Sequence, residues 1–144
     1  MSAFWVRIGA ILGGLAVTFG AFGAHGLKGT MDPKSLETFE TAAKYQMYHA
    51  LALVAVGLLG LTGRPGPGVN AAGSLFLVGT LLFSGALYAL AFGGPRQLGR
   101  FAPIGGLFQI AGWLALAGAA GGKSIGETRS EIPSAGNTHD PASD

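Results

Sequence analysis

The sequence contains no cysteine among its 144 residues. Disulfide bonds, thiolate metal sites and a cysteine nucleophile are therefore excluded, and cysteine usage gives no indication of the redox compartment. Charged residues are also scarce, at 11% of the chain compared with about 25% in ordinary soluble domains. So few charges could not cover the surface of a soluble fold of this size.

The balance of charge is nearly neutral. The net charge is +2, and the nine basic residues are scattered along the chain. A nucleic-acid-binding surface needs clustered basic residues, so no nucleic-acid partner is predicted. The length suits a single domain, since domains hold roughly 100–200 residues.

Four windows of the chain contain no charged residue, at positions 8–27, 45–63, 65–95 and 101–122. A helix needs about 20 apolar residues to cross a hydrocarbon core roughly 30 Å thick. The windows therefore predict an all-α integral membrane protein with four transmembrane helices, in a domain over residues 1–121. Residues 122–144 lack an apolar pattern and are predicted to form a disordered polar tail.

The first window has a second interpretation, as a signal peptide that is removed after export. Its positively charged region would contain only Arg7, and the bulky Phe22 occupies the candidate cleavage site at residues 21–24. A retained helix over about Trp5 to Ala24 is favoured. In that helix, Trp5 and Arg7 are expected to anchor one end at the membrane interface.

An amphipathic helix is predicted between the first and second spans. Asp32 is a good N-cap and Pro33 suits the first helical position, and apolar residues then recur at spacings of three and four. Residues 33–44 are expected either to lie on the membrane surface or to form a stalk continuous with the second span. The second span itself has only a short apolar stretch, from Ala50 to Leu61, and must draw residues 45–49 to the hydrocarbon edge.

Small residues are spaced by four along two of the predicted spans, which places them on one face of each helix. Such faces let two helix backbones approach closely in lipid, so they are predicted to be packing faces. The predicted packing residues are Gly9, Gly13, Ala16, Gly20, Ala24, Gly85 and Ala89.

Polar side chains near the membrane interior form a candidate cluster. These residues are His25, Tyr45, Gln46, His49, Ser84, Tyr88 and Gln109. His25 ends the first span and His49 begins the second, so a helical hairpin would bring both to the same side. We expect the two histidines to mark the interface and to connect the first two helices by hydrogen bonds. A metal or haem site, which needs three or four ligands, is disfavoured, and no cofactor is predicted.

Four segments in order resemble one family. They are "GAFGAHGL", "TAAKYQMYHALAL", "FSGALYAL" and "PIGGLFQIAGW". Over residues 5–120 the chain resembles the small bacterial inner-membrane proteins of the YgdD type, whose eukaryotic relative is transmembrane protein 256. The resemblance implies a compact four-helix membrane protein of uncharacterised function, in the bacterial inner membrane with both termini in the cytoplasm. It implies no catalytic residues.

Two classes of function follow. No phosphate-binding loop, Ser–His–Asp set or carboxylate within a span is present, so no enzyme activity is predicted. The first class is a non-catalytic accessory, assembly or lipid-packing subunit that contacts the bilayer and either a larger membrane complex or a second copy. The second class is a minimal oligomeric transporter or channel that uses the polar faces of helices two and three. Ion pathways usually contain a charged residue within the span, and its absence here favours the first class.

The positive-inside rule does not decide the orientation. With four spans, four basic residues lie on the side of the termini and five on the other, at Arg7, Arg64, Lys123 and Arg129 against Lys28, Lys34, Lys44, Arg96 and Arg100. The cytoplasmic placement of the termini therefore depends on the family resemblance alone.

Overall fold

The computed structural model describes residues 1–62 and 66–121, and within them the chain is helical, with one isolated β-bridge between Lys28 and Met31 and no strand. The predicted tail at 122–144 lies outside the described residues. The elements are α1 (Ser2–Ala21), the π-helix η1 (Phe22–Leu27), α2 (Pro33–Leu61), α3 (Pro67–Ala91), the 3₁₀-helix η2 (Arg96–Arg100) and α4 (Phe101–Gly121).

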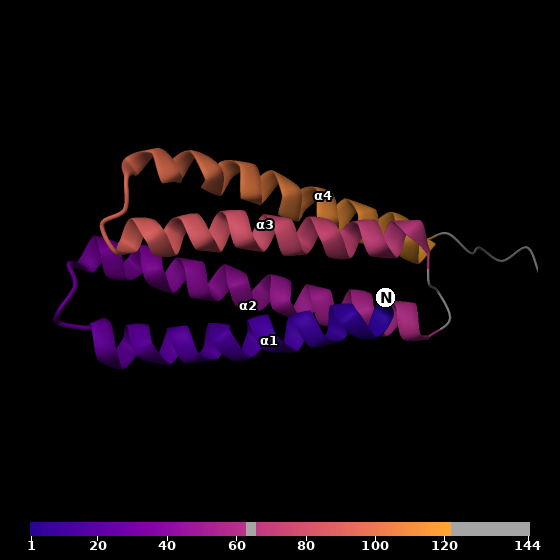
Figure 1. Ribbon diagram of the computed structural model, residues 1–144, viewed down its shortest axis with the longest axis horizontal. Helices are drawn as coiled ribbons and strands as arrows, with labels where there is room; N and C mark the ends of the chain where they lie inside the picture. The colour runs from indigo at the N-terminus through magenta and orange to yellow at the C-terminus, as the bar shows by residue number, and fades with distance from the viewer. Residues whose placement is uncertain (63–65, 122–144) are drawn as a thin grey trace, which may run out of the picture.

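The four long helices form an up-and-down array in which each packs on its neighbour in sequence (Figure 1). α1 packs on α2, α2 on α3, and α3 on α4. The N-terminus lies at the same end as the last turn of α2 and the first turn of α3, and the α1–α2 and α3–α4 connections lie at the opposite end. The central pair α2 and α3 is therefore covered by α1 on one side and by α4 on the other.

α1 passes directly into the π-helical turn Phe22–Leu27, so helical structure extends three residues beyond the predicted Ala24. Glycines make this wider turn feasible next to α2. A Cβ atom on Gly23 would lie 3.1 Å from the Phe39 ring, so a larger residue would require that ring to shift by a few tenths of an ångström. The chain then reverses at Gly29, whose φ of +88° is a conformation that side chains with a Cβ rarely adopt.

α2 is one continuous helix of 29 residues, about 44 Å long at 1.5 Å per residue. Of the two predicted alternatives for residues 33–44, the stalk is therefore correct, and the separate surface helix is wrong. Asp32 caps the helix: its carboxylate accepts hydrogen bonds from the backbone N–H groups of Lys34 at 3.1 Å and Ser35 at 3.0 Å. Hydrogen bonds from the side chain and backbone of Ser35 lower the pKa of the Asp32 carboxyl.

The main hydrophobic core lies where α1, α2 and α3 meet. Its buried residues are Trp5, Ala52, Leu53, Val56, Val69, Ala72 and Phe76. The expectation that Trp5 is an interfacial anchor is wrong, because its side chain is only 3% exposed. Its indole Nε1–H donates a hydrogen bond of 3.0 Å to the side-chain oxygen of Asn70 on α3. α1 is thus tied to α3 as well as packed on α2.

Close helix contacts depend on glycine at a few positions. A Cβ on Gly9 would lie 2.7 Å from the Ala50 carbonyl oxygen, and one on Gly57 would lie 2.7 Å from the Val6 nitrogen, so α1 and α2 meet backbone to backbone. Gly105 and Gly79 make the same kind of contact between α4 and α3. At these positions the absence of a side chain lets the two helix backbones come into van der Waals contact.

The predicted packing residues divide into two groups. Gly9 and Ala16 are buried, and a Cβ on Gly13 would meet the Ala50 side chain at 3.7 Å. Packing contacts within the chain are not found at three others. Ala24 and Gly85 are exposed, Gly20 is partly exposed, and a Cβ on Gly20 or Gly85 would meet nothing within 4 Å. Ala89 is half-buried. The close backbone contact between α1 and α2 lies near Gly9, and at Gly20, about three turns further along α1, no neighbouring atom lies within 4 Å of a Cβ.

Three described helical stretches are long and apolar enough to cross a membrane: Ser2–Leu27, Pro67–Ala91 and Arg96–Gly121. The sequence predicts four membrane-crossing helices, and three of the described helical stretches are long and apolar enough to be such helices. α2 is not among them because its apolar part begins only at Ala50, after a first half that carries Lys34, Glu37, Glu40 and Lys44.

Candidate functional site

Three residues of the predicted polar cluster form a hydrogen-bonded set that we call the interhelical clamp: Gln46, Ser84 and Tyr88. The Gln46 side-chain nitrogen donates to the Leu12 carbonyl at 2.8 Å, and its oxygen accepts from the Tyr88 hydroxyl at 3.0 Å. The Ser84 hydroxyl donates to the Ala42 carbonyl at 2.9 Å. The interhelical clamp therefore connects α1, α2 and α3, and its polar groups are paired inside the chain.

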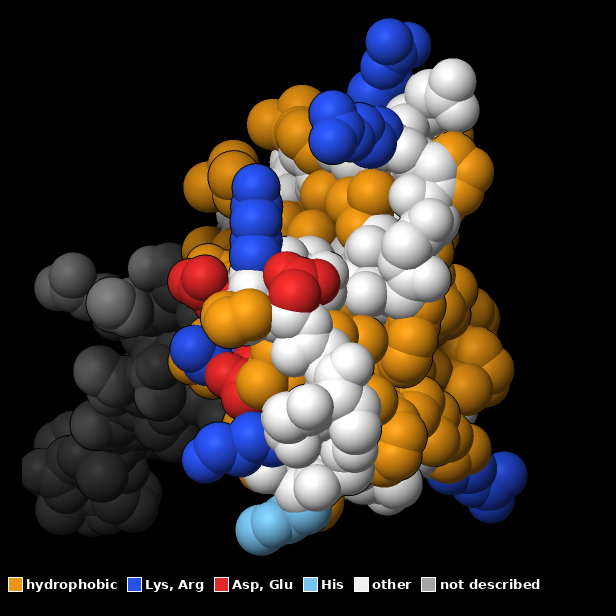
Figure 2. All heavy atoms as spheres, turned by 90° about the vertical axis from the view of Figure 1, so that its left-hand side faces the viewer, with side chains coloured by type: hydrophobic (Ala, Val, Ile, Leu, Met, Phe, Trp, Pro, Cys, Tyr) orange, Lys and Arg blue, Asp and Glu red, His pale blue; other side chains and the backbone are white. Residues whose placement is uncertain are grey.

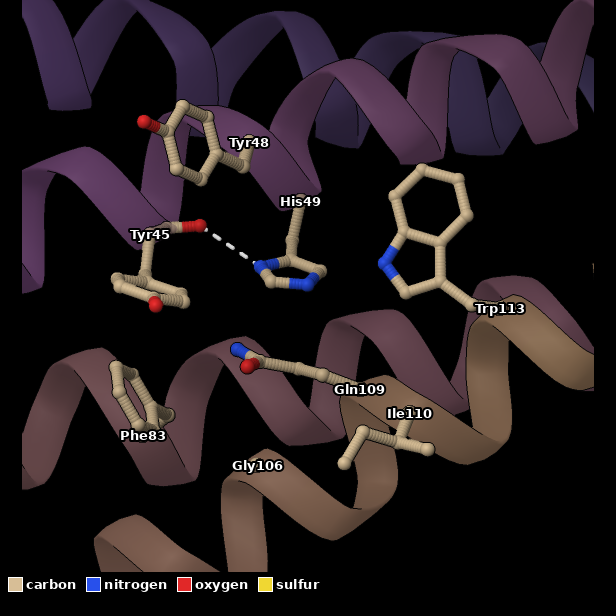
Figure 3. A pocket seen from close by; sticks show the side chains of 8 residues that line it. All are labelled: Tyr45, Tyr48, His49, Phe83, Gly106, Gln109, Ile110 and Trp113. Atoms are coloured by element: carbon tan, nitrogen blue, oxygen red, sulfur yellow. Dashed lines mark hydrogen bonds between the residues drawn. The ribbon is translucent and has the colours of Figure 1, made fainter.

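Three other residues of the cluster line a pocket between α2 and α4, which we call the lateral pocket (Figure 3). Its volume is about 550 Å³. α2 and α4 both pack against α3, and the pocket occupies the wedge that this arrangement leaves between them. The lining residues are Tyr45, Tyr48, His49, Phe83, Gly106, Gln109, Ile110 and Trp113.

The His49 ring forms one wall of the lateral pocket and is only 5% exposed. Its Nδ1 lies 2.8 Å from the Tyr45 carbonyl oxygen, one turn earlier on α2. A carbonyl can only accept, so Nδ1 carries the proton, and in the neutral ring Nε2 is left as an acceptor. The ring centroid lies 5.7 Å from that of Phe76 and 6.4 Å from that of Trp113, which hold the imidazole between α3 and α4.

Gln109 lies opposite His49, on α4, and is 4% exposed. Its side chain packs on Gly79 of α3, where a Cβ would come within 2.8 Å of the Gln109 Cγ. Among the described residues its amide nitrogen is buried and has no hydrogen-bond partner. A buried unpaired donor costs roughly 1–3 kcal/mol, and in residues 1–62 and 66–121 this amide nitrogen is the fully buried side-chain donor that lacks a partner.

The expectation that the two histidines connect the first two helices is wrong, since the hydrogen bond of the His49 ring goes to its own helix. His25 is exposed on the π turn, whereas His49 faces α3 and α4 on the other side of α2. The reason is the register of α2, which turns Gln46 rather than His49 toward α1. No group of three or more His, Asp or Glu residues that could hold a metal ion is found in residues 1–62 and 66–121.

Five lining residues of the lateral pocket were not predicted: Tyr48, Phe83, Gly106, Ile110 and Trp113. Trp113 follows Gln109 by four residues, and that spacing places both on one helix face. The spacing could therefore have indicated that Trp113 lies beside Gln109. Phe83 has no such signal. It immediately precedes the clamp residue Ser84, and only the packing of α3 between α2 and α4 turns it into the pocket.

A family described as "Protein of unknown function (DUF423)" matches residues 19–106. The match covers more than half of the chain, from the end of α1 to the first turns of α4. The chain belongs to this family. The matched region contains the whole interhelical clamp and the α2 and α3 walls of the lateral pocket, and it ends before Gln109.

Curated relatives agree with this membership. A UPF0382 membrane protein of Staphylococcus haemolyticus is 56% identical over 48 residues, which are 33% of this chain and 39% of the relative. A UPF0382 membrane protein of Haemophilus influenzae is 50% identical over 44 residues, 31% of this chain and 36% of the relative. The matches thus span less than two fifths of these relatives' length. No solved structure matches the chain.

The predicted resemblance to a family of small membrane proteins is confirmed by these findings. The chain is a multi-pass membrane protein of a family to which no activity is assigned.

Proposed function

We propose that α2 is a fourth membrane span and that the chain crosses the bacterial inner membrane four times. The support comes from where its polar residues point. Gln46 and His49, which interrupt the apolar stretch of α2, are 4% and 5% exposed, so they face other helices rather than lipid. Tyr45 and Tyr48 are the exposed members of this turn, and the bodies of their rings present apolar surface to lipid. The surface that α2 presents to lipid is therefore more apolar than the amino-acid composition of the helix suggests.

Labelling of single cysteines tests this topology, and the cysteine-free chain provides a clean background. Lys28→Cys and Gln97→Cys are expected to react with a membrane-impermeant maleimide from one side, and Thr62→Cys from the other. All three positions are exposed. Our proposal that both termini are cytoplasmic adds that the first two react from outside the cytoplasm. Labelling of positions 28 and 62 from the same side would show that α2 does not cross.

In this bilayer setting, the chain acts as a non-catalytic accessory or assembly subunit of a larger membrane complex. The observation that carries this proposal is the interhelical clamp: the polar faces of α2 and α3, which a transport path would need, are paired with each other and with backbone carbonyls. The buried polar side chains of the described residues are Gln46, His49, Thr80, Ser84 and Gln109, and none of them is a carboxylate, lysine or arginine.

The distribution of charge agrees with this role. Figure 2 views the end of the molecule that carries the α1–α2 and α3–α4 connections, where lysine, arginine and acidic side chains gather. Behind this end, the flank on the right of this view is hydrophobic. Large apolar side chains are exposed on all four helices, for example Ile11, Leu51, Leu81 and Leu114. Lipid or the helices of a partner must cover these side chains.

Deletion and reconstitution together test the role. In native gels of detergent-solubilised membranes, deletion is expected to change the size or abundance of a defined complex, and the wild-type chain is expected to restore it. Proteoliposomes of the purified chain are expected to carry protons and potassium no faster than protein-free liposomes. Unchanged complexes together with flux that depends on Gln46 would instead support the transporter.

A further inference from the structure

We propose that the lateral pocket binds a membrane-soluble hydroxyaromatic molecule, a phenol or quinol with an apolar tail, held by His49 and Gln109. This goes beyond the accessory role, since the pocket is separate from the interhelical clamp. Figure 3 shows the His49 ring and the Gln109 amide turned into the space bounded by Tyr45, Phe83 and Trp113.

The hydrogen-bonding groups of the pocket define the polar part of the ligand. Gln109 presents a buried amide N–H without a partner, and His49 presents Nε2 as an acceptor, because Nδ1 donates to the Tyr45 carbonyl. A hydroxyl group satisfies both, since its oxygen accepts from Gln109 while its hydrogen is donated to His49. An ether or a ketone could satisfy only Gln109.

The aromatic walls of the pocket indicate which group carries the hydroxyl of the ligand. Tyr45, Tyr48, Phe83 and Trp113 supply ring faces and edges around the two polar groups. Aromatic rings attract one another in offset and edge-on arrangements, so a planar ring is the group that these walls complement. The volume of about 550 Å³ lies within the range of roughly 300–1,000 Å³ that is typical of small-molecule sites.

The outer rim of the pocket defines the route of access. Ile110 and Trp113 are 59% and 49% exposed on the outer face of α4, which is one of the apolar membrane-crossing stretches. An apolar tail attached to the bound ring can therefore leave the pocket between α2 and α4 and remain in lipid. A ligand that enters from the bilayer needs no aqueous channel through the chain.

Binding of radiolabelled 4-nonylphenol to the full-length chain in lipid nanodiscs tests the proposal, with empty nanodiscs subtracted. 4-Nonylanisole, which replaces the hydroxyl by a methyl ether, is expected to compete about fivefold less well, because it cannot donate to His49. 1-Dodecanol, which has the hydroxyl but no ring, is also expected to compete less well. These comparisons use the unaltered protein, so they do not depend on any variant folding.

Two variants assign the contacts. Gln109→Met is expected to weaken nonylphenol and nonylanisole equally, about fivefold, because both accept from the amide. His49→Phe is expected to abolish the preference for the phenol. The matched controls Gln97→Met and His25→Phe change exposed residues outside the pocket and should leave both affinities unchanged. Equal competition by the phenol, the ether and the alcohol would overturn the proposal, because a cavity filled by any acyl chain behaves in that way.

Discussion

Gly105→Ala is expected to push α3 and α4 apart and to lower the free energy of unfolding by about 1–3 kcal/mol. A Cβ atom at this position would lie 2.5 Å from the backbone nitrogen of Phe83 and 2.8 Å from the carbonyl oxygen of Gly79. Both neighbours are backbone atoms and cannot rotate away, so one helix must move. Thermal unfolding of the purified chain in detergent measures the effect.

The adjacent residue supplies a matched control. A Cβ on Gly106 would meet only the Phe83 ring, at 3.9 Å, which is an ordinary contact. Gly106→Ala should therefore be neutral or stabilising, by up to ~1 kcal/mol, because alanine is the better helix former. If both variants melt like the wild type, α3 and α4 do not approach as closely as the structure places them.

Gln46→Leu is expected to lower the free energy of unfolding by about 2 kcal/mol. The substitution removes two interhelical hydrogen bonds, which contribute ~0.6 kcal/mol each on average in membrane proteins. It also leaves the partly buried Tyr88 hydroxyl without its acceptor, which adds about 1 kcal/mol, the lower end of the cost of a fully buried unpaired group. The Leu12 carbonyl is affected less, since its position within α1 gives it a bond to the helix backbone as well.

A second substitution separates these contributions. Tyr88→Phe removes the hydroxyl that Gln46→Leu leaves unpaired, so the double variant should be more stable than Gln46→Leu alone. Gln97→Leu, an identical change at an exposed position, should have little effect. Additive effects of the two single substitutions would show that Gln46 and Tyr88 are not coupled, and the interhelical clamp would then lose its central bond.

The sequence was a good guide to the helices because charge is excluded from the spans. It could not show whether residues 33–44 continue α2, since both alternatives bury the same apolar stripe. The structure decides through Phe39, whose ring packs 5.0 Å from Tyr88 and 5.7 Å from Phe92, both in or at the end of α3. These contacts join residues about 50 positions apart, and local patterns contain no information about them.

The candidate polar residues were identified by their chemistry, but their grouping was not. Two residues three positions apart on a helix can contact different neighbouring helices when the helix is packed between them. Gln46 faces α1 and α3, whereas His49 faces α3 and α4, so one predicted cluster becomes two sites. His25 belongs to neither, because the π turn places it on the surface. Only the way in which the helices pack against one another shows which polar residues belong together.

The hydrogen bond between Trp5 and Asn70 has a consequence for the order of assembly. Its partners are 65 residues apart, so the ribosome must add α2 and the start of α3 after Trp5 before the bond can form. At about 5–20 residues per second, this delay is roughly 3–13 seconds. During that time the α1–α2 hairpin can close through Gly9 and Gly57, with the indole still unpaired. The α1–α2 hairpin is therefore synthesised in full before Trp5 can gain its acceptor, and the arrival of Asn70 on α3 supplies it.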